Sequence, residues 1–226
     1  MTTRLLASGR GLGPVLGLHA ALLVGGAVAL ALEPPAEGWA VLVCVVAFAA
    51  ALPAACRAAG RRDLAELAGF LVLVSLFQLL PDWVLADVLG TLRFPDTGGP
   101  RVDDVIPVAM AAMWVAPLFV VVALSGGRPG RAALLAALVF LGTELLAPSL
   151  GLWEPTGEVH RFLGVATYVV PAEAALGWAV ATAHARVRRG SLPVRAAAAL
   201  AVSTFYLGAL VLAHFVIDLA DWRLTA

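Results

Sequence analysis

Charged residues are scarce in this sequence, and lysine is absent altogether. Aspartate, glutamate and arginine together make up 13% of the 226 residues, whereas charged residues make up about 25% of a soluble domain. Apolar residues reach 62% and the mean hydropathy is +0.95. A buried core does not need so much apolar surface, so part of it must face lipid. The formal net charge is zero, which argues against a nucleic acid partner.

Cysteine is also rare, and its spacing excludes the usual structural roles. Only Cys44 and Cys56 are present, both in one apolar segment. Twelve residues of helix would separate them by about 18 Å, which is too far for a disulfide. The sequence has no CxxC motif and no Cys/His cluster, so we expect no metal site.

Several catalytic motifs are missing as well. Asp103-Asp104 is followed by Val-Ile-Pro, so there is no DDxxD motif for a magnesium–diphosphate site of the prenyltransferase type. GxSxG, HExxH, P-loop and dinucleotide fingerprints are absent too. We therefore expect any reaction to begin with protonation by a carboxylic acid, without a cofactor. No internal repeat is evident, so an inverted-repeat transporter gains no support.

What the sequence does contain is seven apolar runs of about the 20-residue length that crosses a bilayer. They cover residues 14–33, 38–56, 64–81, 105–124, 132–148, 162–183 and 196–217. We therefore predict an all-α, polytopic membrane protein, in which residues 1–226 form a single domain of seven transmembrane helices. No clear small-residue cleavage site follows the first run, which favours a retained helix over a signal peptide.

The arginines between these runs alternate from one side of the expected membrane to the other. Eleven of the fifteen fall on one side, namely Arg4, Arg10, Arg57, Arg61, Arg62, Arg128, Arg131, Arg186, Arg188, Arg189 and Arg195. The other four are Arg93, Arg101, Arg161 and Arg223. The positive-inside rule then predicts a cytoplasmic N-terminus and an external C-terminus. Arginine in place of lysine indicates a GC-rich genome, and we expect a multi-pass protein of a bacterial inner (plasma) membrane.

The longest connection, residues 82–104, carries features of a lid. Its first ten residues predict a short interfacial helix, with Trp83 at the level of the headgroups. The PDTGGP sequence that follows predicts a turn. Because connections of this length are often functional, we predict that this segment covers the outer mouth of the bundle.

Two carboxylates lie where membrane helices rarely carry them. Glu144 is in the outer third of the fifth run, and Glu173 is near the middle of the sixth, two residues after Pro171. A carboxylate in the membrane costs about 3 kcal/mol on insertion scales, so it usually faces the bundle interior and has a function. Consecutive spans are normally antiparallel neighbours. We therefore expect the two glutamates to share a cavity without direct contact, and one of them to serve as the general acid.

Polar residues on two further runs predict additions to this cavity. Gln78 and Asp82 follow one face of the third run, and Tyr206, His214 and Asp218 follow one stripe of the seventh. We expect Asp82 to be a further acid. We also expect Asp218, with His214, to act as a base or to orient the acid.

Aromatic residues predict the wall of the same cavity. Our substrate-binding candidates are Trp114, Tyr206, Tyr168 and Trp178, together with Gln78. Aromatic ring faces stabilise cations, and a desolvated carboxylic acid keeps its proton at neutral pH. This combination of a protonated acid and aromatic rings is suited to forming and stabilising a carbocation.

Short motifs between Gly142 and Trp178 resemble those of known families. Their order is Glu144-Leu-Leu-Ala-Pro148, Gly151-Leu-Trp153, Val170-Pro171-Ala-Glu173 and Gly177-Trp178. It resembles the bacterial integral-membrane carotenoid hydratases and, more loosely, the small-subunit lycopene cyclases. The seven-span plan with acids from Glu144 to Asp218 is also similar to that of the membrane-bound meroterpenoid cyclases, a group of terpene cyclases. The resemblance implies protonation of an isoprenoid double bond, followed by ring closure or water addition. The lycopene cyclases usually carry a second acid after the first, where this chain has Ala174.

The sequence thus predicts a membrane enzyme for a lipophilic, isoprenoid-like small molecule, with Glu173 or Glu144 as the acid. Two alternatives stay open: a proton-coupled carrier that uses the same acids as a relay, and a non-catalytic membrane subunit. Acids that converge on one pocket would favour the enzyme. A chain of acids across the membrane would favour the carrier, and acids facing outward would favour the subunit. The oligomeric state is not predicted.

Overall fold

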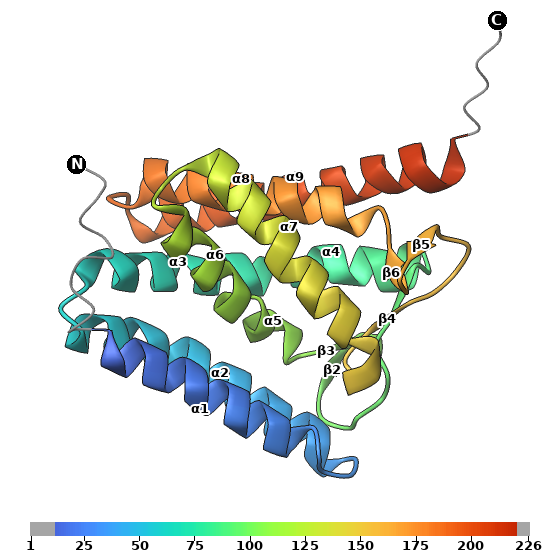
Figure 1. The fold of residues 1–226 in the computed structure, drawn as a ribbon, viewed down its shortest axis with the longest axis horizontal. Helices are drawn as coiled ribbons and strands as arrows, with labels where there is room; N and C mark the ends of the chain where they lie inside the picture. The colour runs from blue at the N-terminus through green and yellow to red at the C-terminus, as the bar shows by residue number, and fades with distance from the viewer. Residues whose placement is uncertain (1–11, 221–226) are drawn as a thin grey trace, which may run out of the picture.

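Helices make up most of the described chain, residues 12–220 of this computed structural model (Figure 1). In chain order the elements are α1 (Gly13–Ala29), α2 (Ala36–Ala58), α3 (Arg62–Phe77), α4 (Leu79–Trp83), η2 (Val84–Val88), β1 (Leu92–Arg93), β2 (Arg101–Val102), β3 (Ile106–Pro107), α5 (Met110–Met113), α6 (Val115–Ser125), α7 (Pro129–Leu146), η3 (Pro148–Leu150), β4 (Glu154–Pro155), β5 (Arg161–Phe162), β6 (Val165–Ala166), α8 (Val169–Val187), α9 (Leu192–His214) and η4 (Phe215–Leu219).

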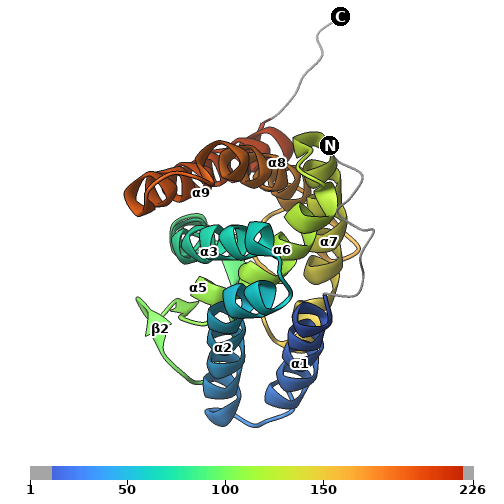
Figure 2. The same cartoon turned by 90° about the vertical axis from the view of Figure 1, so that its left-hand side faces the viewer.

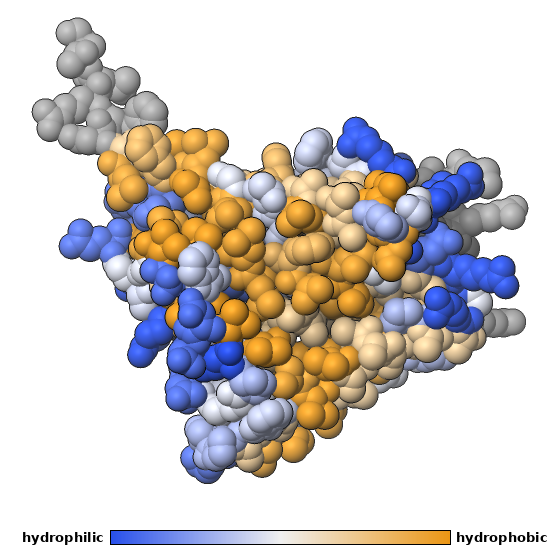
Figure 3. All heavy atoms as spheres, turned by 180° about the vertical axis from the view of Figure 1, so that it is seen from behind, coloured by the Kyte–Doolittle hydropathy of each residue, from blue (hydrophilic) through white to orange (hydrophobic). Residues whose placement is uncertain are grey.

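Four helical segments of the described chain are long and apolar enough to cross a membrane. They are Ala36–Ala58, Arg62–Val88, Pro129–Leu146 and Leu192–Leu219. Two shorter helices, Gly13–Ala29 and Met110–Ser125, are also apolar. In the space-filling view, a broad band of apolar side chains separates two hydrophilic ends (Figure 3). These helices and this surface are those of a membrane protein.

The two ends of the bundle differ in what they carry. The turns between α2 and α3, α6 and α7, and α8 and α9 lie together at one end, on the left in Figure 1. The arginines of these turns and of the adjoining helix ends therefore gather there. The short strands, with Arg93, Arg101 and Arg161, lie at the opposite end. Arg4, Arg10 and Arg223 lie outside the described residues.

Two of the predicted spans begin later in the structure than in the sequence analysis. Residues 105–109 and 162–168 belong to the short hairpins β2–β3 and β5–β6 and to the turns that follow them, and the helices start at Met110 and Val169. Each hairpin turns on residues with positive φ, Asp103 and Asp104 in the first, and Leu163 and Gly164 in the second. The apolar runs predicted the location of these helices but not the hairpins that precede them.

The segment 82–104 does contain a helix and a turn, but the helix is not a separate interfacial one. Residues 79–88 form α4 and η2, which continue α3 in one line (Figure 1). The chain then crosses the end of the bundle as β1, which pairs with β4 and places Arg93 in an ion pair with Glu154. The turn that follows rests on α2, where the Gly38 N–H donates to the Thr97 carbonyl oxygen at 2.9 Å. A Cβ on Gly38 would overlap the backbone of Gly98, so this contact requires glycine.

The order of elements repeats, contrary to the expectation from the sequence. A helix, a short strand, a hairpin and a returning helix occur first as α3–α4–η2, β1, β2–β3 and α5–α6. They occur again as α7, β4, β5–β6 and α8. Leu92, Pro95, Arg101 and Val105 recur sixty residues later as Leu152, Pro155, Arg161 and Val165. Both units start at the arginine-rich end (Figure 1). The repeat is therefore parallel rather than inverted, and its two units meet at the β1–β4 pair.

The helices of both units pack closely against their neighbours. α8 packs against α7 and α9, while α3 packs against α2, α6 and α9 (Figure 2). At the α7–α8 crossing, a Cβ on Gly177 would lie 2.6 Å from the carbonyl oxygen of Ala132. Glycine at this position lets the two backbones approach closely, as small residues do in other membrane helices.

Candidate functional site

A cavity of about 420 Å³ lies between the α1–α2 hairpin and the helices that carry the predicted acids. Asp82 of α4, Glu144 of α7 and Glu173 of α8 all line it. The remaining wall is mostly apolar, with leucine, methionine, phenylalanine and tryptophan side chains. Both the size and this lining are typical of small-molecule sites, which measure about 300–1,000 Å³. The structure therefore brings three carboxyls from separate helices to one apolar cavity.

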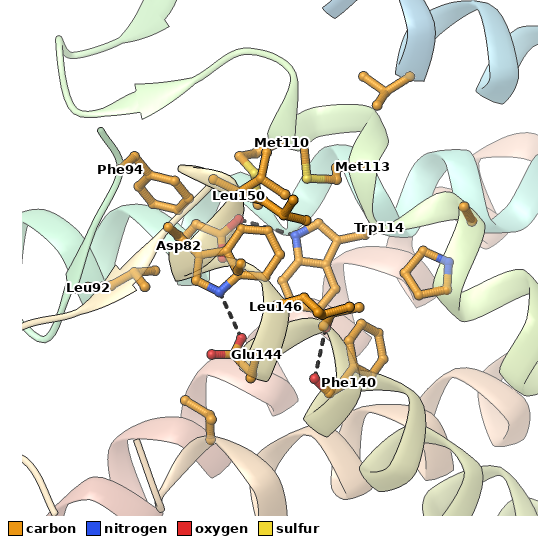
Figure 4. A pocket seen from close by; sticks show the side chains of 18 of the residues that line it. Asp82, Leu92, Phe94, Met110, Met113, Trp114, Phe140, Glu144, Leu146 and Leu150 are labelled. Carbon is orange, nitrogen blue, oxygen red and sulfur yellow. Dashed lines mark hydrogen bonds between the residues drawn. The ribbon is translucent and has the colours of Figure 1, made fainter. Parts of the chain in front are cut away.

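Two of these carboxyls are each held by an indole. The Nε1–H of Trp114 donates to Asp82 Oδ2 at 3.2 Å, and the Nε1–H of Trp153 donates to Glu144 Oε1 at 3.0 Å. Figure 4 shows the Asp82 and Glu144 side chains with their hydrogen bonds. Buried polar groups are nearly always paired in this way. Each indole fixes the position of one acid and adds an aromatic ring to the cavity wall.

Glu173 differs from the other two acids because its buried oxygen is unpaired. The residue is 1% exposed, and Oε2 has no hydrogen-bond partner among residues 12–220. Glu144 lines the same cavity, and no hydrogen bond or ion pair joins it to Glu173 in the described chain. A buried acceptor without a partner costs about 1–3 kcal/mol. Glu173 is thus the acid that a molecule inside the cavity can engage.

Aromatic rings lie beside the acids. Trp114 and Tyr206 both line the cavity, and their ring centroids are 5.8 Å apart in an edge-on arrangement. Tyr168 also lines it and donates its hydroxyl proton to Thr91 Oγ1 at 2.8 Å. Three of the four aromatic residues predicted to bind a substrate therefore share one wall with the carboxyls. Ring faces of this kind stabilise positive charge.

Two of the predicted substrate-binding residues lie elsewhere. Gln78 is fully buried, but its Oε1 accepts a hydrogen bond from Ser203 on α9, and it is not among the lining residues described. Trp178 is 45% exposed and its ring packs against Phe205. Helical spacing predicted which residues share a face, but the crossing of neighbouring helices decides where that face points.

His214 and Asp218 form a separate cluster with His160, which was not among the predicted site residues. Asp218 accepts a hydrogen bond from the His160 backbone N–H at 2.8 Å, and its carboxyl lies 2.9 Å from His160 Nδ1 and 2.8 Å from His214 Nδ1. The described cavity lining includes none of these three residues. His214 reaches it only indirectly, through a ring contact of 5.1 Å with Tyr168. The cluster therefore supports Tyr168 and ties the β4–β5 loop to η4, and it does not place Asp218 as a base in the cavity.

Several other residues of the site were not predicted from the sequence. Trp153 binds Glu144 nine residues earlier in the chain, and Thr91 binds Tyr168. Met110, Met113 and Leu92 of β1 also line the cavity. The position of Trp153 within the Gly151-Leu-Trp153 motif was the one available signal. Within residues 12–220, no three histidine, cysteine, aspartate or glutamate residues are grouped to hold a metal ion.

Comparison with known proteins finds one family. The family described as "Domain of unknown function (DUF6989)" matches residues 79–217, which is more than half of the chain. No curated protein and no solved structure matches. The matched region contains all three cavity carboxyls, whereas α1 and α2, which form the facing wall, precede it.

Proposed function

The chain belongs to the DUF6989 family, and we propose that it is an integral membrane enzyme that protonates a double bond of an isoprenoid-like lipid. The observation that carries this proposal is the unpaired Glu173 carboxyl in an apolar cavity beside Trp114 and Tyr206. The motif resemblance between Gly142 and Trp178 suggests the isoprenoid class.

In the proposed reaction, Glu173 is the general acid. A carboxyl in a dry apolar cavity is least costly in its neutral form, so it carries a proton to donate. Transfer of this proton to one carbon of the double bond leaves a carbocation on the other and a carboxylate on Glu173. The rings of Trp114 and Tyr206 then stabilise the cation while it persists.

The cation is consumed in one of two ways, and both return a proton. In ring closure, a second double bond attacks the cation and a neighbouring C–H gives up its proton. In hydration, water adds and its extra proton leaves. The Glu173 carboxylate takes this proton back, and Glu144 and Asp82, which share the cavity, are the residues that we propose to assist its return, in place of Asp218 and His214. The proton balance closes without a cofactor.

The membrane arrangement that we propose has seven spans, with the N-terminus inside and the C-terminus outside a bacterial inner membrane. The three arginine-rich turns at one end of the bundle support it under the positive-inside rule. In this orientation the strands and the three carboxyls lie in the outer half.

The convergence of the acids favours an enzyme over the two alternatives. Asp82, Glu144 and Glu173 line one cavity, whereas a proton relay needs acids spaced across the membrane. Some carriers contain parallel repeats. Many others place their midplane binding site between inverted repeats, and the repeat in this protein is not inverted. A subunit that uses its polar residues to hold a partner would carry them on its surface.

The proposal is tested by replacing the acid and measuring the lipids of the host. Lipid extracts of cells with and without the gene identify the product, and Glu173→Gln should lower its yield by about 100-fold or more, because a general acid contributes at least this factor. Glu66→Gln is the matched control, since Glu66 lies on α3 outside the described cavity lining. Melting temperature and gel filtration check that both variants fold. Full product yield from a folded Glu173→Gln protein would show that Glu173 is structural.

A further inference from the structure

The exposed part of the cavity wall lies on one side only. Of the residues that line the cavity in the described chain, four are exposed: Leu23 and Ala27 on α1, Leu146 at the end of α7, and Leu150 in η3. Leu23 is 73% exposed and Leu146 is 58% exposed. Glu173, in contrast, is 1% exposed on the inner wall. The cavity therefore has a mouth between α1 and the C-terminal end of α7.

This mouth faces lipid rather than water. Its four exposed residues are all apolar, and α1 contains no aspartate, glutamate or arginine between Gly13 and Ala29. Further large apolar side chains are exposed along the same two helices, namely Leu16, Val24, Val28, Leu134, Leu138 and Leu145. A continuous apolar surface of this kind is solvated by the hydrocarbon of a bilayer.

The strand end of the cavity, in contrast, is covered. Leu92 and Pro155 line the cavity from the paired strands β1 and β4, and Phe94 lines it from the residue that follows β1. Phe94 is 5% exposed, and the Arg93–Glu154 ion pair crosses the same two strands. The loop after Phe94 is secured on α2 by the Gly38–Thr97 hydrogen bond. A ligand from the aqueous phase would have to displace this cover.

We propose that the cavity takes its ligand sideways from the bilayer, between Leu23 of α1 and Leu146 of α7. The ligand is an uncharged, mostly hydrocarbon chain dissolved in the lipid, and it reaches Glu173 by passing Glu144, which lies one helical turn or less from the mouth. This route adds a path of entry to the proposed function, and the identity of the reacting group in the ligand rests on that proposed function. The mouth itself can be tested without turnover.

The test uses a reporter cysteine inside the cavity. Ala166 lines the cavity and is 2% exposed, so Ala166→Cys in a Cys44→Ala/Cys56→Ala background gives one thiol at a buried position. The full-length protein is placed in lipid nanodiscs. Labelling rates are measured with pyrene maleimide, which dissolves in lipid, and with a sulfonated maleimide, which stays in water. We expect the lipid-soluble reagent to label faster.

Tryptophan substitutions at the mouth then locate the route. Leu23→Trp and Leu146→Trp should slow pyrene maleimide labelling about tenfold, which corresponds to a barrier of about 1.4 kcal/mol. Val24→Trp and Leu145→Trp are matched controls, because these neighbours are exposed on the same helices and are not among the described lining residues. The controls should label at the unsubstituted rate.

Three results would overturn the route. Equal labelling of mouth and control variants would place the mouth elsewhere. Faster labelling by the sulfonated reagent would mean that the cavity opens to water. No labelling by either reagent, at Ala166→Cys and at a second reporter, Thr143→Cys, would mean that the cavity is closed. If labelling follows the expected pattern but Glu173→Gln keeps full activity, the route stands and the catalytic proposal alone fails.

Discussion

At the scale of single residues, the three cavity acids are distinguished by their partners. Trp114 holds Asp82 and Trp153 holds Glu144, whereas Oε2 of Glu173 is unpaired within the described chain. A paired carboxyl is fixed in position, and an unpaired one is free to engage a ligand. This difference, rather than depth alone, is why we assign the acid role to Glu173.

The Trp114–Asp82 hydrogen bond should contribute measurably to stability. Trp114→Phe keeps an aromatic ring but leaves Asp82 Oδ2 without its donor, so the free energy of unfolding should fall by about 1–3 kcal/mol. Trp39→Phe is the control, because Trp39 is 54% exposed on α2. Unfolding in detergent, followed by circular dichroism, measures both.

A double-mutant cycle separates this bond from the loss of ring volume. In an Asp82→Ala background, Trp114→Phe should cost less than in the natural protein, with a coupling energy of about 0.5–3 kcal/mol. Equal costs in the two backgrounds would show that the indole contributes packing and not a hydrogen bond.

At the scale of elements, the α7–α8 crossing determines how Glu144 and Glu173 are placed relative to each other. The two helices approach closely at Gly177, where a Cβ would collide with Ala132 and Ala136. The hairpins before α5 and α8 fix where these helices begin, and thereby the height of Trp114 and Glu173 in the bundle. Packing and hairpin together position the site.

Gly177→Ala should therefore disturb both the fold and the cavity. Overpacking at this crossing should lower stability by about 1–3 kcal/mol. Gly142→Ala, on α7 where a Cβ would meet nothing within 4 Å, should be neutral or stabilising by up to about 1 kcal/mol. Melting temperatures in one detergent compare the two variants. A Gly142→Ala protein as unstable as Gly177→Ala would argue against the packing explanation.

At the scale of the whole molecule, the protein is a helical bundle with an apolar band between two polar ends (Figure 3). The arginine-rich turns share one end and the strands share the other. The cavity lies towards the strand end, beneath the β1–β4 pair. In the proposed orientation, a ligand that arrives through the mouth would react in the outer half of the membrane.

Reporter fusions test this orientation. Alkaline phosphatase fused after Arg128 or Arg189 should be inactive, because these turns face the cytoplasm in the proposed arrangement. A fusion after Asp104, in the β2–β3 turn at the opposite end, should be active. Green fluorescent protein fusions at the same sites should give the reverse pattern. An active phosphatase at Arg189 would contradict the orientation.

Sequence alone predicted a helical membrane protein, because apolar runs of bilayer length and scarce charge are typical of one. It also identified Glu144 and Glu173 as acids of interest, since a carboxylate inside such a run is costly. The helix and turn within residues 82–104 followed from local pattern as well. These properties depend on residues close together in the chain.

Tertiary structure decided which of the candidates meet. Asp82 and Tyr206 reach the cavity while Gln78, Trp178, His214 and Asp218 do not, because helical spacing defines a face but not the direction in which that face points. The pairings of Trp153 with Glu144 and of Asp218 with His160, and the hairpins that recur before α5 and α8, depend on contacts between turns and helix ends. The proposed mouth between α1 and α7 depends on where these two helices lie in the bundle. Such relations arise only when the helices pack.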